Sequence, residues 1–497
     1  MFRQLANCLL ILIAFAIPIE HKYDKLFRHF SYTLIPEGLT LHGFDKKISF
    51  YASDLAAILL FAITIFALKV PLRRLILYNG APFLWILFAC AATSLCFSPL
   101  CNYPVVYTRL LQLLTPILLF SVLSHISTPG KTTSTLFGAF LVAALIQSLI
   151  AITQYVTQHP LGLSLLNESR QQTAGFLIQG GYRWIFDEIF HRTAHTPSMI
   201  RACGTFVHPN VLGSFLTLSL IASYSILAAT EKIWLRRLLG LSFFLQFIAL
   251  SLTFSRSALF GWVLGTLIWF AFSIYHKGFR AVLSNRKIRF LLATILTSVA
   301  LSCALFHKQY LHRGGVFNYN ELAASSDQVR LDAQTIAFNL IKGHPLLGVG
   351  YQQYTQAVAR YLPPGQKADV VHNIYLLIAA EMGWPALLSF LSFIAIIGWA
   401  AIRSPYTPEL ASLLAIFIAL LFIGCCDFTP ILLQQGRLMF FCTAGLMASE
   451  TIRFRTPLRQ NAELHNQEPV AKPAFLHKSD DFGASPRSAQ IGISDWA

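Results

Sequence analysis

Long apolar segments recur along this chain, separated by short polar connections and by one long polar loop. A helix needs roughly 17 to 25 mostly apolar residues to cross the hydrocarbon core of a bilayer. Because 55% of the 497 residues are hydrophobic and 12% are charged, the chain carries more apolar surface than a water-soluble fold could bury. The pattern predicts an all-α fold, a polytopic integral membrane helical bundle of about 12 spans. The predicted spans lie near residues 5–19, 54–70, 82–97, 106–124, 135–157, 208–229, 238–254, 257–275, 290–306, 373–402 (with a break), 409–426 and 430–449.

Lysine and arginine residues gather in the connections on one side of this alternation, which predicts that this side is cytoplasmic. The net charge of +16 is therefore a topology signal, and nucleic acid is not expected as a partner. Both termini should be cytoplasmic, and the segments 20–53, 158–207 and 307–372 should lie on the opposite face. The basic set comprises Lys69, Arg73, Arg74, Lys131, Lys232, Arg236, Arg237, Lys277, Arg280, Arg286, Lys287, Arg289 and Arg403, with Arg3, Arg453, Arg455 and Arg459 near the termini.

Two regions are predicted, a membrane-embedded domain over residues 1–455 and a disordered, polar tail over 456–497. The first span is short and follows Arg3, so we expect a signal anchor, with a cleaved signal peptide as the alternative. Most of the nine cysteines fall inside apolar spans, where they act as small buried hydrophobes. Cys101 and Cys203 lie on the outer side, where a disulfide between them is an open alternative. No metal-ligand spacing occurs, so we expect no metal and no cofactor.

The first candidate for chemistry is the segment Arg201-Ala-Cys-Gly-Thr-Phe-Val-His208-Pro-Asn210, which leads directly into a span. Pro209 suits the first turn of a helix, so the free backbone N–H groups of that helix should face outward near Arg201. A positive helix end beside an arginine makes an anion site. The alternative is an ordinary loop entering a helix, with an arginine that reaches toward lipid headgroups.

The second candidate is Arg256, in the tight connection Thr253-Phe-Ser-Arg-Ser257 between two spans. The connection is too short to carry the guanidinium away from the apolar boundary, where an unpaired charge is costly and usually functional. Its alternative role is to anchor the chain on a lipid phosphate.

The third candidate region is the long loop 307–372. Ser325 and Ser326 resemble a helix start, and Gly343 followed by Pro345 makes a plausible stop, so a helix over 326–341 should carry Arg330. Its apolar stripe would let it lie on the membrane surface or on the bundle. Gly348 and Gly350 then turn the chain.

The fourth candidate is His372-Asn373, at the start of the following span. Histidine exchanges a proton near neutral pH, which suits activation of a hydroxyl acceptor, although a lone histidine at this depth is more often structural. Glu381 should brace the helix break before Pro385. Arg109 and Arg437 are buried by the predicted spans and either extend an anion path or neutralise Asp427.

These residues together resemble the O-antigen ligase and polymerase superfamily of bacterial envelope enzymes. The matching pieces are Arg201–Asn210 (R-x-x-G-T-F-x-H-P-N), Ser255-Arg256-Ser257, the run from Arg330 through His344-Pro-Leu-Leu-Gly348-Val-Gly350, and His372-Asn373 followed by Glu381-x-Gly383. They occur between residues 200 and 385 in the expected order.

The resemblance implies a C-type glycosyltransferase-like membrane fold that uses neither a metal nor a nucleotide sugar. Such enzymes move a glycan from an undecaprenyl (polyprenyl) diphosphate carrier to a hydroxyl at the periplasmic face of the inner membrane, with inversion. Carried across, Arg201, Arg256 and His372 would be catalytic. The substrate-binding set would be Arg330, His208, Asn210, Asn373, Gly348, Gly350 and Arg109.

Three acceptors compete within this resemblance. Lipid A-core would make the protein a ligase, a growing glycan would make it a polymerase, and a protein hydroxyl would make it an O-oligosaccharyltransferase. The R-x-x-G-T-F-x-H-P-N motif at 201–210 and the His372-Asn373 ending favour the ligase. The alternative from a different class is a flippase for lipid-linked oligosaccharides, which should show polar groups through the bilayer midplane and two related halves.

Overall fold

The computed structural model describes residues 2–18, 51–99, 104–163, 166, 168, 177–179, 198–313, 321–362 and 368–452. Residues Met1–Phe454 form one compact unit. The predicted tail and Cys101 lie outside the described residues. Cys203 is a buried, free cysteine.

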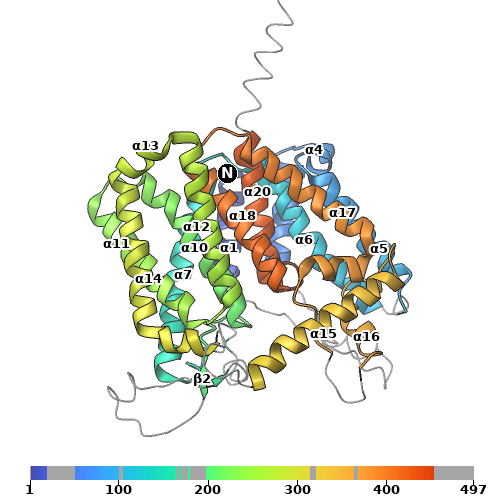
Figure 1. The fold of residues 1–497 in the computed structure, drawn as a ribbon. Coiled ribbons are helices and arrows are strands. Elements are labelled where there is room, and N and C mark those ends of the chain that lie inside the picture. The colour runs from blue at the N-terminus through green and yellow to red at the C-terminus, as the bar shows by residue number, and fades with distance from the viewer. Residues whose placement is uncertain are drawn as a thin grey trace, which may run out of the picture. The chain divides into compact units, whose positions relative to one another are not determined.

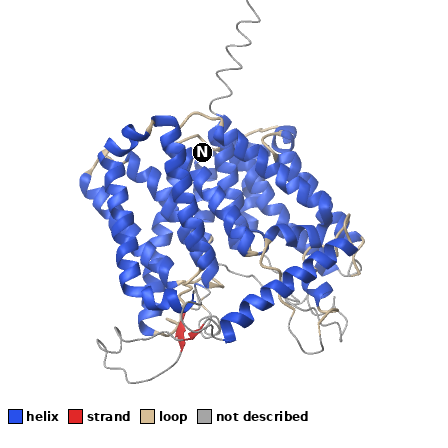
Figure 2. Cartoon of the chain, viewed as in Figure 1, coloured by secondary structure: helices blue, strands red, loops and turns tan. Residues whose placement is uncertain are grey.

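Helices make up almost all of the described unit (Figures 1 and 2). One short antiparallel pair joins β1 (Leu177–Gln179) to β2 (Ser198–Ile200). The helices are α1 (Phe2–Ala16), α3 (Ala52–Ala62) with the π-helix η1 (Ile63–Ala67), α4 (Leu72–Leu77), α5 (Ala81–Cys96), α6 (Pro104–Ile126), α7 (Lys131–Thr157), α10 (Pro209–Ala229), α11 (Ile233–Leu252), α12 (Arg256–Lys277), α13 (Phe279–Ser284), α14 (Arg286–Arg313), α15 (Glu321–Gly343), α16 (Tyr354–Val358), α17 (Ile374–Ile402), α18 (Pro408–Cys426), α19 (Thr429–Leu432) and α20 (Gln434–Ile452).

The all-α, polytopic membrane fold is confirmed. Within the described residues, eight helices are long and apolar enough to cross a membrane, and three shorter apolar helices accompany them. Each predicted span overlaps at least one helix of the list above, and the spans 54–70 and 430–449 each overlap two. Helix α14 continues to Arg313, past the predicted end at 306. The end was predicted from apolarity, which marks only the lipid-embedded part of a helix, whereas the helix propensity of the following residues decides where the helix stops.

Glycines of α12 bring this helix close to α18. A Cβ atom added to Gly261 would lie 2.9 Å from Ile423, and one added to Gly265 would lie 3.0 Å from the carbonyl oxygen of Ala415. Two glycines four residues apart let helix backbones approach closely in a membrane. The close packing places Arg256, the first residue of α12, at the same end of the bundle as the last residues of α18.

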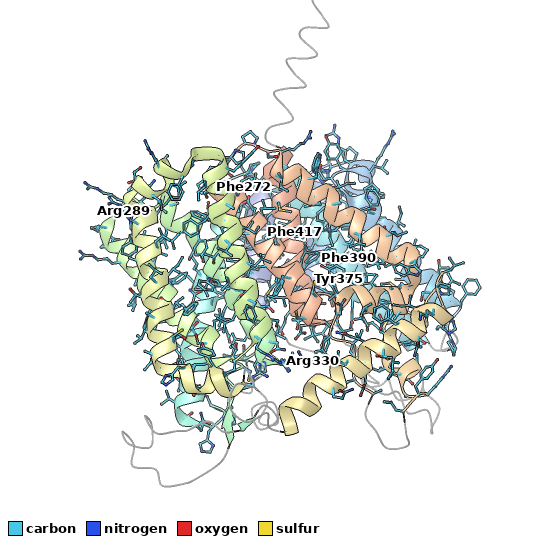
Figure 3. All side chains as sticks on the ribbon, in the orientation of Figure 1. Phe272, Arg289, Arg330, Tyr375, Phe390 and Phe417 are labelled. Atoms are coloured by element: carbon cyan, nitrogen blue, oxygen red, sulfur yellow. The ribbon has the colours of Figure 1, made fainter. Side chains whose placement is uncertain are left out.

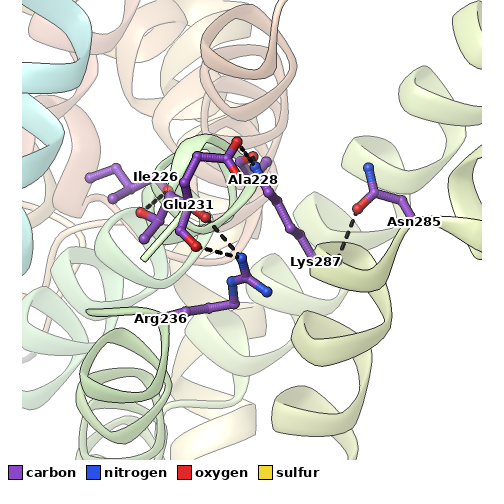
Figure 4. Close-up of polar contacts among 7 residues, drawn as sticks. Ile226, Ala228, Glu231, Arg236, Asn285 and Lys287 are labelled. Carbon is purple, nitrogen blue, oxygen red and sulfur yellow. Dashed lines mark hydrogen bonds and ion pairs between the residues drawn. The ribbon is translucent and has the colours of Figure 1, made fainter. Parts of the chain in front are cut away.

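Short connections at one end of the bundle, called the basic end, carry lysines and arginines. At the basic end, where α10 ends and α14 begins, Lys287 pairs with Glu231 at 2.5 Å and donates to the Ala228 carbonyl at 3.1 Å (Figure 4). Arg236 donates to the carbonyls of Thr230 and Glu231. At the opposite end, called the site end below, α10, α12 and α17 begin and α18 ends. Arg289 and Arg330 mark these two ends in Figure 3.

The long loop contains the predicted helix that carries Arg330, but its predicted start was wrong. Helix α15 begins at Glu321, ahead of Ser325 and Ser326, and ends at Gly343 as expected. The residues Glu-Leu-Ala-Ala at 321–324 are strong helix formers, so the helix extends through the serines.

The expected break in the span 373–402 is present in α17. Gly383 has a φ of 80° and lies two residues before Pro385. The chain after α15 fills this break, because Trp384 N donates to the Pro345 carbonyl at 2.8 Å and Val349 N donates to the Ala380 carbonyl at 2.9 Å. The end of α15 is thereby fixed to α17.

Candidate active site

Asn210 links an arginine and a carboxylate at the site end. Its side-chain oxygen accepts from Arg201 Nη2 at 2.8 Å, and its side-chain nitrogen donates to Asp427 Oδ2 at 2.6 Å. Asp427, which follows α18, is 3% exposed, and its other oxygen accepts from the Thr429 backbone N–H at 3.0 Å. The pair Arg201 and Asp427, far apart in sequence, is thus bridged by one amide at the start of α10.

Arg201 is itself buried, with 7% of its surface exposed, and its Nε donates to the Thr253 carbonyl at 2.8 Å. Glutamines of α7 hold the loop that follows it. Gln154 Oε1 accepts from Gly204 N at 2.8 Å, and Gln147 Oε1 accepts from Thr205 N at 3.0 Å. Buried amides that satisfy backbone groups in this way fix a loop that has no regular structure of its own. Arg201 is therefore held in one place.

His372 lies beside the same carboxylate. Its ring contacts Phe428 with 5.0 Å between ring centroids. Burial lowers the pKa of His372 below its usual 6.5, and the Asp427 carboxylate opposes this shift. The Arg330 guanidinium lowers the pKa of His372 further, whereas the Asp369 carboxylate raises it. With a lowered pKa, the imidazole is neutral at pH 7 and can accept a proton.

Two more arginines approach the end of α18. The guanidinium groups of Arg256 and Arg330 lie close enough to Cys426, the last residue of that helix, to interact with it electrostatically. The carboxylate of Asp427 does so as well. Arg256 is exposed, and Arg330 is half-buried. Residues from α10, α12, α15, α17 and α18 therefore share one site.

Three helix N-termini add to the positive character of the site end. His208 caps α10 by accepting from Asn210 N at 3.0 Å, and Ser255 caps α12. Asn373 caps α17 by accepting from Tyr375 N at 2.9 Å and Leu376 N at 3.0 Å, and it donates to the Cys425 carbonyl at 3.2 Å. Helix N-termini carry partial positive charge, so this end of the bundle favours an anion.

The remaining predicted site residues meet at the break in α17. Gly350 N donates to the Glu381 carbonyl at 3.0 Å, and a Cβ on Gly348 would lie 2.2 Å from the carbonyl carbon of Glu381. Arg109 donates to the Gln352 carbonyl. The Glu381 carboxylate accepts from Tyr354 N at 3.2 Å, as expected of a residue that braces this break.

Asp427 is a site residue whose partners the sequence left open. Neutralisation by Arg109 or Arg437 is one open alternative from the sequence, and the hydrogen bonds of the carboxylate go to Asn210 and Thr429. Asn210 and Asp427 are 217 residues apart, so no local pattern could pair them. Gln147 and Gln154 were missed, although two amides inside an apolar span are a signal that could have found them.

This arrangement defines an integral membrane protein of helices that holds arginines, an imidazole and a carboxylate at one end of its bundle. Among the described residues, no group of three or more His, Cys, Asp or Glu side chains could hold a metal ion.

Residues 241–391 match the family model described as O-antigen ligase, which supports the resemblance of the motifs to the O-antigen ligase and polymerase family. The matched region includes Arg256, Arg330, His372 and Asn373, while Arg201 and Asn210 precede it. A search of curated proteins found no match. Members of this family are glycosyltransferase-like enzymes, and the match supports a role in ligation or polymerisation of envelope glycans.

Proposed function

We propose that this protein transfers a glycan from an undecaprenyl diphosphate carrier to a hydroxyl acceptor at the periplasmic face of the bacterial inner membrane. The acceptor that we propose is lipid A-core, which makes the protein an O-antigen ligase. The observation that carries this proposal is the meeting of His372, Asp427 and the arginines at one end of the bundle.

Arg256 is the proposed primary contact of the donor diphosphate, because it is exposed at the N-terminus of α12. A guanidinium binds phosphate oxygens in a bidentate manner, and a helix N-terminus favours the same anion. Arg201 adds a fixed charge at the site, and Arg330 adds another from α15. As the glycosidic bond breaks, negative charge grows on the departing diphosphate, and charges already in position stabilise it.

His372 is the proposed general base. The imidazole takes the proton of the acceptor hydroxyl, the acceptor oxygen forms a bond to the anomeric carbon, and the bond from that carbon to the carrier oxygen breaks. The electron pair of the broken bond stays on the diphosphate, which leaves with its lipid, and the anomeric configuration inverts. The carboxylate of Asp427 then stabilises the imidazolium, as it favours the protonated ring.

Transfer can be tested with purified protein in lipid nanodiscs, a radiolabelled carrier-linked glycan and rough lipopolysaccharide. Ligation yields a labelled lipid A-core product and free carrier diphosphate in equal amounts. A polymerase would instead lengthen the carrier-linked glycan and need no lipid A-core. A flippase would release no carrier diphosphate, and that result would contradict the proposal.

The envelope glycolipids of a deletion strain give an independent test. Loss of a ligase leaves long glycan chains unattached to lipid A-core. Loss of a polymerase leaves lipid A-core capped by single repeat units. The second pattern would show that the acceptor is a growing glycan.

A further inference from the structure

Arg437 of α20 is a buried charge that the proposed reaction does not use. It is 1% exposed, and its Nη1 donates to the carbonyls of Leu432 at 2.8 Å and Ile431 at 3.3 Å. Its Nη2 donates to Gln434 Oε1 at 2.9 Å. Arg437 therefore binds the last carbonyls of the short helix α19, which would otherwise be unsatisfied at the helix end.

A network of hydrogen bonds connects Arg437 through Gln434 to polar residues of α3 and α6. Gln434 Nε2 donates to Asp54 Oδ1 at 2.7 Å, and the Thr115 hydroxyl donates to the same oxygen at 2.7 Å. The charge of Asp54 also acts on Arg437. Both terminal nitrogens of the buried Arg437 guanidinium thus have hydrogen-bond partners, and these bonds fix its position, because a buried polar group that loses its partners pays a large desolvation cost.

The segment that Arg437 holds is the connection 427–433 between α18 and α20. Gly436 packs against this connection so closely that an added Cβ would lie 1.9 Å from the Thr429 carbonyl oxygen. The same connection begins with Asp427 and Phe428, which are the neighbours of His372 described above. Arg437 thus acts on one end of a seven-residue segment whose other end borders the proposed base.

We infer that Arg437 is a positioning residue, which fixes the connection 427–433 so that Asp427 and Phe428 stay against His372. This inference rests on the proposed role of His372 as the base. The carbonyl contacts of Arg437, the tight fit of Gly436 and the ring contact of Phe428 carry it.

A structural role alone would have different consequences. The charged groups that face His372 are Asp427 from the end of α18, Arg330 from α15 and Asp369 from its own segment. If Arg437 is lost and Asp427 withdraws, the charge that favours the protonated imidazole is weakened. The acid limb of the pH–rate profile then moves to lower pH, while plateau turnover falls. A variant that is merely less stable would lose active protein without any shift of this limb.

The test compares Arg437→Gln, Arg437→Lys and Gly436→Ala in the full chain in nanodiscs, with Glu450→Gln as the control. Glu450 is equally buried at the opposite end of α20, where it accepts from Gly130 N at 2.6 Å. We expect kcat to fall about 100-fold for Arg437→Gln, since small misplacements have such effects, with little change in donor KM. Arg437→Lys should recover part of this loss. The acid limb should shift for Arg437→Gln and Gly436→Ala and stay in place for Glu450→Gln.

Hydrogen exchange followed by mass spectrometry separates failure of this inference from failure of the proposed function. Peptides that cover 427–433 should exchange faster in Arg437→Gln than in the parent, whether or not His372 is the base. Unchanged exchange in this segment would overturn the inference. If exchange rises but the parent shows no acid limb that depends on His372, the assignment of the base is wrong, and with it the catalytic part of the inference.

Discussion

At the scale of single residues, the protonation of His372 sets how transfer should depend on pH. Burial lowers the pKa of His372 below 6.5, and only the neutral ring can act as a base. The transfer rate should therefore stay constant as pH falls through 6.5 and decline only at lower pH. Replacing Asp427 by Asn should move this decline to still lower pH, because the carboxylate raises the pKa of His372. A pH–rate profile of purified enzyme measures both effects.

The variant His372→Ala should lose turnover about 100-fold or more, which is the usual contribution of a general base. Donor affinity should be unchanged, because the diphosphate is bound by arginines. Turnover near the parent rate would assign proton transfer to another group.

Arg256→Ala should lower kcat/KM for the carrier-linked donor about 100-fold, as removal of one preorganised contact to a developing anion does. The matched control is Arg286→Ala, which removes an exposed arginine at the first position of α14, at the basic end. Steady-state kinetics with both variants decides the matter. Equal activities would exclude Arg256 from the donor site.

Some of the site could be predicted from single residues, and some could not. Arg256 has almost no loop around it, and His372-Asn373 begins a span, so the sequence alone places both near one membrane boundary. The hydrogen bonds that join Arg201 through Asn210 to Asp427 could not be predicted from the sequence, because they depend on how α10 packs beside α18. Hydropathy places helices along the chain, but it does not determine which helices are neighbours.

At the scale of elements, the junction between the 344–350 turn and α17 depends on glycine. Gly348→Ala puts a Cβ 2.2 Å from the backbone of Glu381, whereas Gly162→Ala meets nothing within 4 Å, and both glycines have a positive φ, of 67° and 77°. Each substitution should cost about 1–3 kcal/mol in backbone strain. Gly348→Ala should cost a further 1–3 kcal/mol, roughly, for overpacking. Thermal unfolding in nanodiscs compares the two, and equal midpoints would show that the junction is looser than described.

Prediction of elements was strongest where apolarity decides and weakest in the polar loop. Every long span was expected from its composition, and the break at Gly383 from Gly383 and Pro385. The start of α15 was predicted too late, since Ser325 and Ser326 resemble a cap but the residues before them favour helix. Capping signals are weak when helix-forming residues flank them on both sides.

At the scale of the whole molecule, the lysines and arginines of the short connections predict the orientation of the bundle. Lys287 and Arg236 lie near short connections at the basic end, whereas Arg330 lies at the site end in the long segment 307–372, where charges have little weight in the rule. By the positive-inside rule the basic end should be cytoplasmic. Gln328→Cys, on α15, should then react with a membrane-impermeant maleimide in cells with a permeable outer membrane. Ser284→Cys, at the end of α13, should react only after the inner membrane is opened.

Peptide-level mass spectrometry distinguishes these introduced thiols from the native cysteines. The reverse labelling pattern would place the candidate active site in the cytoplasm and would contradict the proposed reaction at the periplasmic face.

The attachment of α15 to the break in α17 has an evolutionary consequence. The bonds from Trp384 N to Pro345, from Val349 N to Ala380 and from Gly350 N to Glu381 join backbone to backbone. Apart from the glycines, they place no demand on side-chain identity. The solvent-facing positions of α15 other than Arg330 can therefore change during evolution while the helix stays attached to α17. Substitutions at those positions could alter which molecules approach the helix without disturbing the bundle.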